Sequence, residues 1–338
     1  MTQMVDHSPL SSGDAAAATS EAPVADFDID SDRDAKPVPL RHPAQWVATA
    51  VLLVFAAMFI HSLFANPNYQ WSVVSHYFFS RVILSGVLLT IELTVIGMSI
   101  SVVIGIVCAV MRLSTNRLLV GASVTYIWFF RACPLMVQLI FWFNLGVLYP
   151  RLGLGIPFGP QFMTFSANSL ITTMMAAILG LSLYEGAYMA EIVRGGILAI
   201  EAGQAEAAQS LGMPRSLTLR RIILPQAMRV IIPPTGNELI GMLKNTALVS
   251  VIALAELLYA AQSIYMRTYQ EIPLLIVVII WYLVIVSVLS VGQYYLERHY
   301  GRGHQVHGSG GFVGYATVLR RFFTFGHPDV PGQGKDQP

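Results

Sequence analysis

The chain has 338 residues, of which 55% are hydrophobic and only 12% are charged, and its formal net charge is +1 at pH 7. An average soluble domain carries about 25% charged residues, so this composition excludes an ordinary soluble protein. The two cysteines lie in apolar sequence and form neither a disulfide framework nor a metal-binding spacing. We therefore interpret the chain as an integral membrane protein that binds no metal.

The first 40 residues differ in composition from the rest. They hold eight acidic side chains against two basic ones, Arg33 and Lys36, and few large apolar residues. Such a segment buries too little apolar surface to offset the entropy lost on ordering. We predict a disordered acidic tail over residues 1–40. No basic leader precedes an apolar core near Met1, so the first apolar span is expected to remain in the mature protein.

Six apolar segments follow the tail. A helix needs about 20 residues to cross roughly 30 Å of hydrocarbon, and the third segment, which is short, is expected to begin near Ile127. The segments cover residues 46–65, 82–111, 134–149, 170–193, 234–252 and 273–295. We predict an all-α membrane protein with a first helix and external loop over 41–82, a membrane domain over 83–300 and a flexible tail over 301–338. The long external loop at 150–168 is rich in Gly and Pro, which favours turns over a folded domain.

Basic residues are distributed unevenly between the loops on the two sides of the membrane. One side carries Arg41, Arg112, Arg117, Arg194, Arg215, Arg220, Arg221, Arg229, Arg298 and Arg302, and the other carries Arg81, Arg151 and Arg267. Loops with an excess of Lys and Arg face the cytoplasm. The distribution predicts that both termini, and the loop at 200–225, are cytoplasmic.

This cytoplasmic loop contains the sequence EAAQSLGMPRSLTLRRIILP over residues 206–225. Gly212 permits the turn that ends a helix, Pro214 discourages continuation, and Pro225 suits the first turn of the next helix. The alanines allow a partner to approach closely, and Glu206 offers a charge to a basic residue on that partner. We predict a short helix that docks a cytoplasmic partner. The predicted coupling residues are Glu206, Ala207, Ala208, Gly212, Leu224 and Pro225.

Several chemical motifs are missing from the sequence. There is no G-x-x-x-x-G-K-[ST] phosphate loop, and the Gly-Lys pair at 334–335 lacks the following hydroxyl residue. No arrangement of Ser, His and Asp or of paired carboxylates predicts catalysis, and no basic and aromatic face predicts nucleic-acid binding. We expect no enzyme activity and no bound cofactor in this chain.

Four segments carry a resemblance to a known family. They are FFRACPLMVQ at 129–138, EGAYMAEIVRGGI at 185–197, EAAQSLGMP at 206–214 and LPQAMRVIIPPTGNELIGMLKNTALVSVI at 224–252. Together they resemble the polar amino acid permease subunits of type I ATP-binding cassette (ABC) importers over roughly residues 85–297. The sequence departs from that family at Ala132-Cys133, where Gly-Thr is frequent, and at Asn245, where an acidic residue is common.

The resemblance implies a fold and a set of partners. The fold would be a five-helix permease core plus one extra N-terminal helix. The chain would import a polar L-amino acid, with glutamate or glutamine favoured, across a bacterial inner membrane. Its partners would be cytoplasmic ATPase subunits that bind ATP and Mg, an extracytoplasmic amino acid-binding protein, and a second permease chain in a homodimer or heterodimer.

Charged residues inside the membrane are costly, about 2.5–3.5 kcal/mol each on insertion scales, so each one suggests a function. Those in the predicted spans are Glu92, Glu185, Glu191, Glu238 and Lys244. Glu191 and Arg194 are three positions apart on one helix, a spacing that predicts a structural ion pair.

The predicted substrate path centres on Glu185 and Lys244. An amino acid carries an ammonium and a carboxylate, which this acceptor and this donor would recognise. Pairing of the two side chains with each other is the alternative. Asn245 and Thr246 are expected either to bond to the substrate or to cap the helix end. Glu92 is expected to serve the path or to join two helices.

Two other functions are weighed against import by an ABC transporter. An ion-coupled secondary amino acid transporter would use Glu92, Glu185 and Lys244 as a relay, but it leaves the loop at 206–225 unexplained. A membrane scaffold would act through the acidic tail. For Gly86, Gly97 and Gly105 we predict helix packing without chemistry. Pro233-Pro234 are expected to interrupt their helix.

Overall fold

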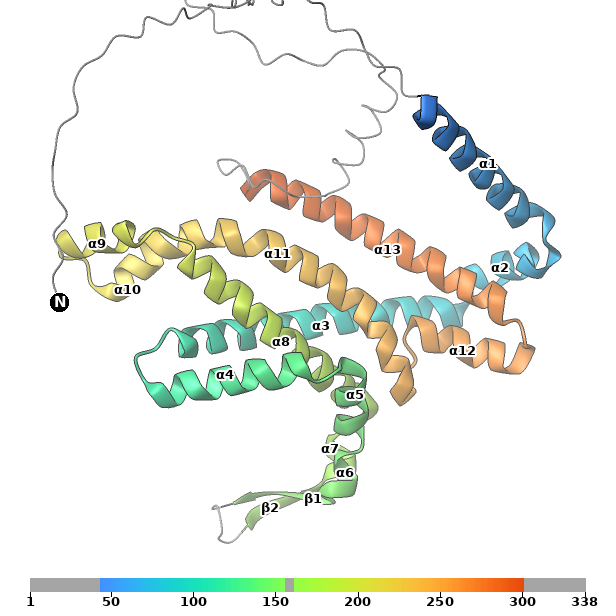
Figure 1. Ribbon diagram of the computed structural model, residues 1–338. Helices are drawn as coiled ribbons and strands as arrows, with labels where there is room; N and C mark the ends of the chain where they lie inside the picture. The colour runs from blue at the N-terminus through green and yellow to red at the C-terminus, as the bar shows by residue number, and fades with distance from the viewer. Residues whose placement is uncertain (1–42, 156–160, 301–338) are drawn as a thin grey trace, which may run out of the picture. The chain divides into compact units, whose positions relative to one another are not determined.

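The computed structural model describes residues 43–155 and 161–300 (Figure 1). The predicted tails, residues 1–40 and 301–338, lie outside these ranges. The chain divides into two units, one ending at Ala65 and one beginning at Asn66. In the first unit, α1 (Pro43–Ala65) is apolar around most of its circumference, as is typical of a helix that faces lipid.

The second unit is mainly helical. Its longer helices are α2 (Trp71–Phe78), α3 (Arg81–Arg112), α4 (Arg117–Ala132), α5 (Leu135–Phe143), α8 (Thr173–Leu198), α9 (Ala202–Ser210), α11 (Leu224–Asn245), α12 (Leu257–Thr268) and α13 (Glu271–Tyr300). Its short elements are η1 (Pro67–Tyr69), α6 (Leu145–Leu148), β1 (Arg151–Gly155), β2 (Gln161–Ser166), α7 (Ala167–Leu170), α10 (Arg215–Thr218), the π-helix η2 (Leu219–Ile223) and the 3₁₀-helix η3 (Thr246–Ile252).

Within the described residues, four helices are long and apolar enough to cross a membrane: α1, α3, α8 and α13. Two bent pairs raise the number to six if each pair forms one span. These are α4 with α5, and the helix at Arg215–Ile252 with α12. The sequence predicts one helix and an external loop over residues 41–82. In the structure this predicted loop contains the further helix α2.

α3 and α8 pack side by side at the centre of the second unit (Figure 1). A Cβ atom at Gly105 would lie 2.5 Å from the Cβ of Met189, so no larger residue fits there. The Ser101 hydroxyl donates to the carbonyl of Ser182 at 3.2 Å. Small residues let helix backbones approach closely in a membrane, which confirms the packing role predicted for this glycine.

The chain bends by 102° between α4 and α5. Pro134 cannot donate a backbone hydrogen bond, which favours a helix end at this point. The Gln138 side-chain amide donates instead to the carbonyls of Phe130 and Cys133, at 3.1 and 2.9 Å. The predicted third span, with its start near Ile127, therefore consists of parts of two helices, α4 and α5, that meet at this corner.

α11 contains Pro233 and Pro234 in its interior, yet it continues to Asn245. The prediction that the two prolines interrupt this helix is wrong. Prolines are tolerated in membrane helices when neighbouring groups satisfy the backbone, and here the Thr235 hydroxyl donates to the carbonyl of Ile231 at 2.8 Å. After α11 the chain continues as the 3₁₀-helix η3, and it then enters α12 after a 43° bend.

β1 and β2 pair as an antiparallel hairpin, with Arg151 opposite Ser166 and an irregularity between Leu154 and Gly155. The sequence predicts only turns in this loop. Glycine is depleted in strands, so the glycines of β1 lower its β-propensity, and a strand is not predicted from the sequence.

Candidate functional site

A helix is present where the sequence predicts the docking helix: α9, which ends at Ser210, with Leu211 as its C-cap and Gly212 just beyond. Gly212 has φ +74°, the left-handed conformation that glycine adopts without a steric penalty. The amide of Met213 donates to the carbonyl of Ala208 at 3.1 Å, and the amide of Gly212 donates to that of Gln209 at 2.9 Å. These two bonds form a Schellman motif, which fixes the end of α9 and the direction of the chain beyond it.

The exposed surface of α9 is formed by only some of the predicted coupling residues. Glu206 and Ala207 are exposed, and Leu211, just past the helix, is 82% exposed. Ala208 is 1% exposed, so the prediction that its side chain meets a partner is corrected. Its small size instead allows α9 to pack closely on α10 and η2 of the same chain.

α10, η2 and α11 follow one another without an intervening loop, from Arg215 to Asn245. Pro225 lies in the first turn of α11, as the sequence predicts, and this helix follows η2 directly. A proline has no amide proton, and the π-turn η2 directly before it accommodates the altered hydrogen bonding. Such π-turns inside helices are frequent at functional sites. Leu224 and Pro225 are both exposed on this helix.

α8 and α11 bring two carboxyl groups together. Glu185 on α8 is 2% exposed, and its Oε1 atom has no hydrogen-bond partner among the described residues. The half-buried carboxyl group of Glu238 on α11 interacts with it directly. Two carboxylates side by side repel each other when both are ionised, and a cation placed between them removes that repulsion. The acidic pair thus has the chemistry to accept a positively charged group.

Two tyrosines and an arginine extend the polar surface around the acidic pair. The hydroxyl oxygens of Tyr184 and Tyr188 are 3.2 Å apart, and Tyr184 interacts with both glutamates. The Arg131 guanidinium from α4 lies 5.0 Å from the centre of the Tyr188 ring, within the range of a cation–π contact. This polar surface thus combines carboxyl acceptors, tyrosine hydroxyls and one cation from the three helices α4, α8 and α11.

Lys244 is not the neighbour of Glu185 that the sequence predicts. It is exposed, and it makes no ion pair with any other described residue. It lies six positions after Glu238 on a helix with 3.6 residues per turn, so the two side chains project from different faces of α11. The alternative in which Glu185 and Lys244 pair with each other is therefore wrong, and the acidic neighbour of Glu185 is Glu238.

The remaining path candidates occupy varied positions. Thr246 is fully buried, and its hydroxyl donates to the carbonyl of Leu243 at 2.6 Å, which is the helix-end role among its two alternatives. Asn245 is half-buried at the end of α11. Glu92 is exposed on α3, and the described part of the chain gives it no interhelical partner.

Glu191 on α8 binds two arginines. Its Oε2 atom accepts from Arg194 at 2.8 Å, which is the predicted pair, and its Oε1 accepts from Arg112 at 2.8 Å. Arg112 is the last residue of α3, so the network ties the ends of the two central helices together. All three side chains are between 23% and 29% exposed. We assign the network a structural role.

The sequence gives no prediction for Glu256, which is 0% exposed at the start of α12. Its carboxyl group accepts from the amides of Leu258 and Tyr259 at 2.9 and 2.8 Å, and the Tyr282 hydroxyl donates to it at 3.4 Å. An acidic residue just before an apolar helical run is an N-cap signal that would have found it. Its bonds hold α12 against α13.

Helices of membrane length, a corner in the membrane region, and a capped helix exposed in a loop define a membrane subunit of a transporter. A family model for the binding-protein-dependent transport system inner membrane component matches residues 101–302. The chain belongs to this family, whose members are the permease subunits of ABC importers.

Individual relatives agree with the family match. The chain is 48% identical to the arginine transport system permease protein ArgU of Corynebacterium glutamicum, over 78% of this chain and 83% of the relative. It is 33% identical to the probable glutamine ABC transporter permease protein GlnM of Bacillus subtilis, over 62% and 88%. A crystal structure of an amino acid ABC transporter with histidines matches with a TM-score of 0.57 and 33% identity, covering 67% of this chain and 97% of that one.

Proposed function

We propose that this chain forms half of a membrane path for the ATP-driven uptake of a polar amino acid, with arginine as the first candidate substrate. The observation that carries the proposal is the acidic pair of Glu185 and Glu238, one of whose oxygens is buried without a partner in the part of the chain that the structure describes. A guanidinium offers five donors in a planar fork that matches carboxylates. Arg131, at the edge of the same surface, is suited to the substrate carboxylate.

The names of the relatives support this class of substrate. An arginine permease is 48% identical to the chain, and permeases named for glutamine are 33% and 34% identical. Glutamine, favoured by the sequence, is the second candidate. Glutamate is disfavoured because its acidic side chain would be repelled by the ionised member of the acidic pair.

Coupling to ATP is assigned to α9. Glu206 and Ala207 on α9, and Leu211 just past it, are exposed, and Gly212 fixes the end of this helix. A force applied there would therefore be transmitted to α10 and α11 without an intervening flexible loop. The nucleotide and its Mg would be bound by separate ATPase subunits in the cytoplasm. The distribution of basic residues supports a cytoplasmic position for α9 and both termini.

A second permease chain would complete the path. Glu92 and Lys244 are charged, exposed in the single chain, and located within predicted spans. Exposure to lipid at that depth would cost about 2.5–3.5 kcal/mol for each side chain. A partner chain against these faces would remove that cost. An extracytoplasmic binding protein would deliver the amino acid to the opposite end of the path.

Equilibrium binding of labelled arginine to the purified transporter, without the binding protein, tests the substrate assignment. Because the binding protein is absent, the measured preference is that of the membrane site alone. We expect unlabelled arginine to compete at least about tenfold better than glutamine, since a charged hydrogen bond is worth roughly 1.5–3 kcal/mol. Equal competition by glutamine or glutamate would contradict the preference for a cation.

A further inference from the structure

One cavity of the second unit lies outside the acidic pair and the docking helix. It has a volume of about 380 Å³ and is lined by Tyr77, Ser80, Val82, Ile264, Arg267 and Thr268. These residues come from the end of α2, the start of α3 and the last turns of α12. This end of the unit is remote from α9 (Figure 1).

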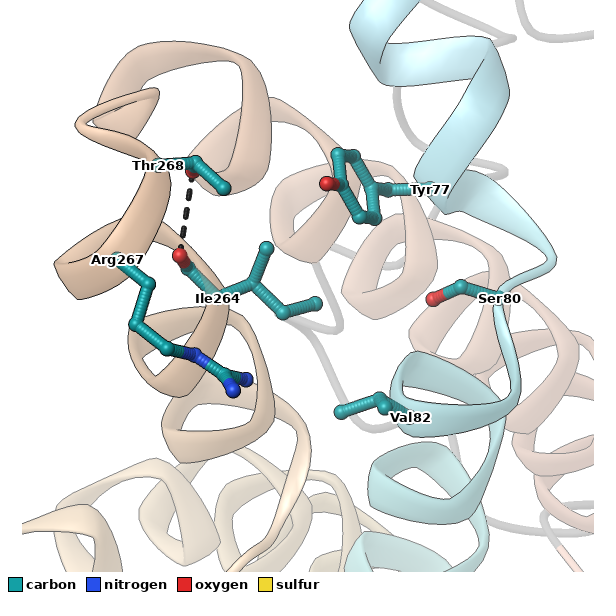
Figure 2. Close-up of a pocket in the computed structure, with 6 residues that line it drawn as sticks. All are labelled: Tyr77, Ser80, Val82, Ile264, Arg267 and Thr268. Atoms are coloured by element: carbon teal, nitrogen blue, oxygen red, sulfur yellow. Dashed lines mark hydrogen bonds between the residues drawn. The ribbon is translucent and has the colours of Figure 1, made fainter.

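The polar groups of the cavity are mainly hydrogen-bond donors. Figure 2 shows the Arg267 guanidinium and the hydroxyls of Tyr77 and Ser80 directed toward the same space. Arg267 uses its Nε to donate to the carbonyl of Ser263 at 2.9 Å, and its two terminal nitrogens have no partner among the described residues. The Thr268 hydroxyl is already committed to the carbonyl of Ile264 at 3.1 Å. No acidic side chain lines the cavity.

This donor set defines the chemistry of a ligand. A guanidinium with two free nitrogens binds two oxygens of a phosphate at once, and hydroxyls can donate to the others. Val82 and Ile264 form an apolar wall next to the guanidinium (Figure 2). A ligand that carries a phosphate diester next to hydrocarbon would satisfy both parts of the cavity.

The surroundings of the cavity favour a lipid over a soluble phosphate. Phe78, next to Tyr77, stacks on Trp281 with ring centres 5.1 Å apart, and the Trp281 indole donates to the Phe78 carbonyl at 3.0 Å. Tyr269, two positions after Arg267, is 93% exposed. Aromatic residues gather in this way at the level of lipid headgroups. We propose that the cavity binds the phosphate headgroup of an acidic phospholipid in the outer leaflet, an inference that rests on the proposed membrane topology.

Native mass spectrometry of the full chain, with phosphatidylglycerol or phosphatidylcholine added to the detergent, tests this proposal. We expect phosphatidylglycerol to bind at least about tenfold more weakly to the Arg267→Gln variant, because a bidentate charged contact is lost. Tyr77→Phe keeps the ring and should weaken binding by a smaller factor. Arg117→Gln removes another exposed arginine, the first residue of α4 and outside the cavity lining, and should leave this binding unchanged.

Further arms separate the possible ligands. Equal binding of phosphatidylglycerol to the wild type and to Arg267→Gln would overturn the proposal. Inorganic phosphate that displaces the lipid at millimolar concentration would assign the cavity to a soluble anion instead. Loss of affinity for the binding protein in Arg267→Gln, with unchanged lipid binding, would assign it to a protein carboxylate. Binding of lipid needs no transport, so these results are independent of arginine recognition.

Discussion

Replacing Glu185 by glutamine is expected to reduce arginine binding and uptake by about 10- to 100-fold. The substitution keeps the size of the side chain and removes its charge. An ionic hydrogen bond in a buried site is worth roughly 1.5–3 kcal/mol, which corresponds to this range. Glu185 is the more buried member of the acidic pair and has an oxygen without a partner, so its loss should have the larger effect. Glu238→Gln should act in the same direction with a smaller magnitude.

The measurement is the binding of labelled arginine to purified variants, followed by initial rates of uptake. Glu271→Gln, an exposed acidic residue in the first turn of α13, is the matched control and should bind arginine normally. Copurification with the ATPase checks that each variant is folded. If folded Glu185→Gln binds arginine as tightly as the wild type, the acidic pair is not the substrate site.

Gly212→Val is expected to weaken association with the ATPase subunits by at least about tenfold. A β-branched residue at φ +74° is strained by about 1–3 kcal/mol, and relief of this strain would break the Schellman motif that ends α9. The exposed residues of α9 would then lose their fixed orientation. Copurification of the ATPase with the variant in detergent gives the readout.

A second glycine of the same helix provides the control for this change. Gly203 lies in α9 without a positive φ, and an added Cβ there would meet no atom within 4 Å. Gly203→Ala should therefore leave docking intact and favour the helix by up to about 1 kcal/mol. Normal ATPase association in Gly212→Val, or an equal loss in Gly203→Ala, would refute the role given to the capped end of α9.

Local sequence signals predicted the helix α9 and its capped end well. Gly212 and Pro214 act through their own backbone geometry, which does not depend on the rest of the fold. The ion pair of Glu191 and Arg194 was likewise predictable from a spacing within one helix. The third residue of that network, Arg112, was not, because it comes from another helix.

Contacts between helices were the part that the sequence alone could not supply. The partner of Glu185 depends on how α8 and α11 are rotated against each other, so the sequence points to Lys244 where the structure has Glu238. The corner at Pro134 was missed because hydrophobicity continues through it, while its support comes from the side-chain amide of Gln138. The length of a hydrophobic segment predicts that the segment enters the membrane, but it does not predict the position of a bend within it.

The most direct test of the central claim is uptake of labelled arginine into proteoliposomes that contain this chain, its ATPase partner and its binding protein. We predict uptake that requires ATP on the ATPase side, requires the binding protein on the other, and is unaffected by collapse of proton and sodium gradients. Uptake that proceeds without ATP and follows an imposed ion gradient would contradict this account and identify a secondary transporter.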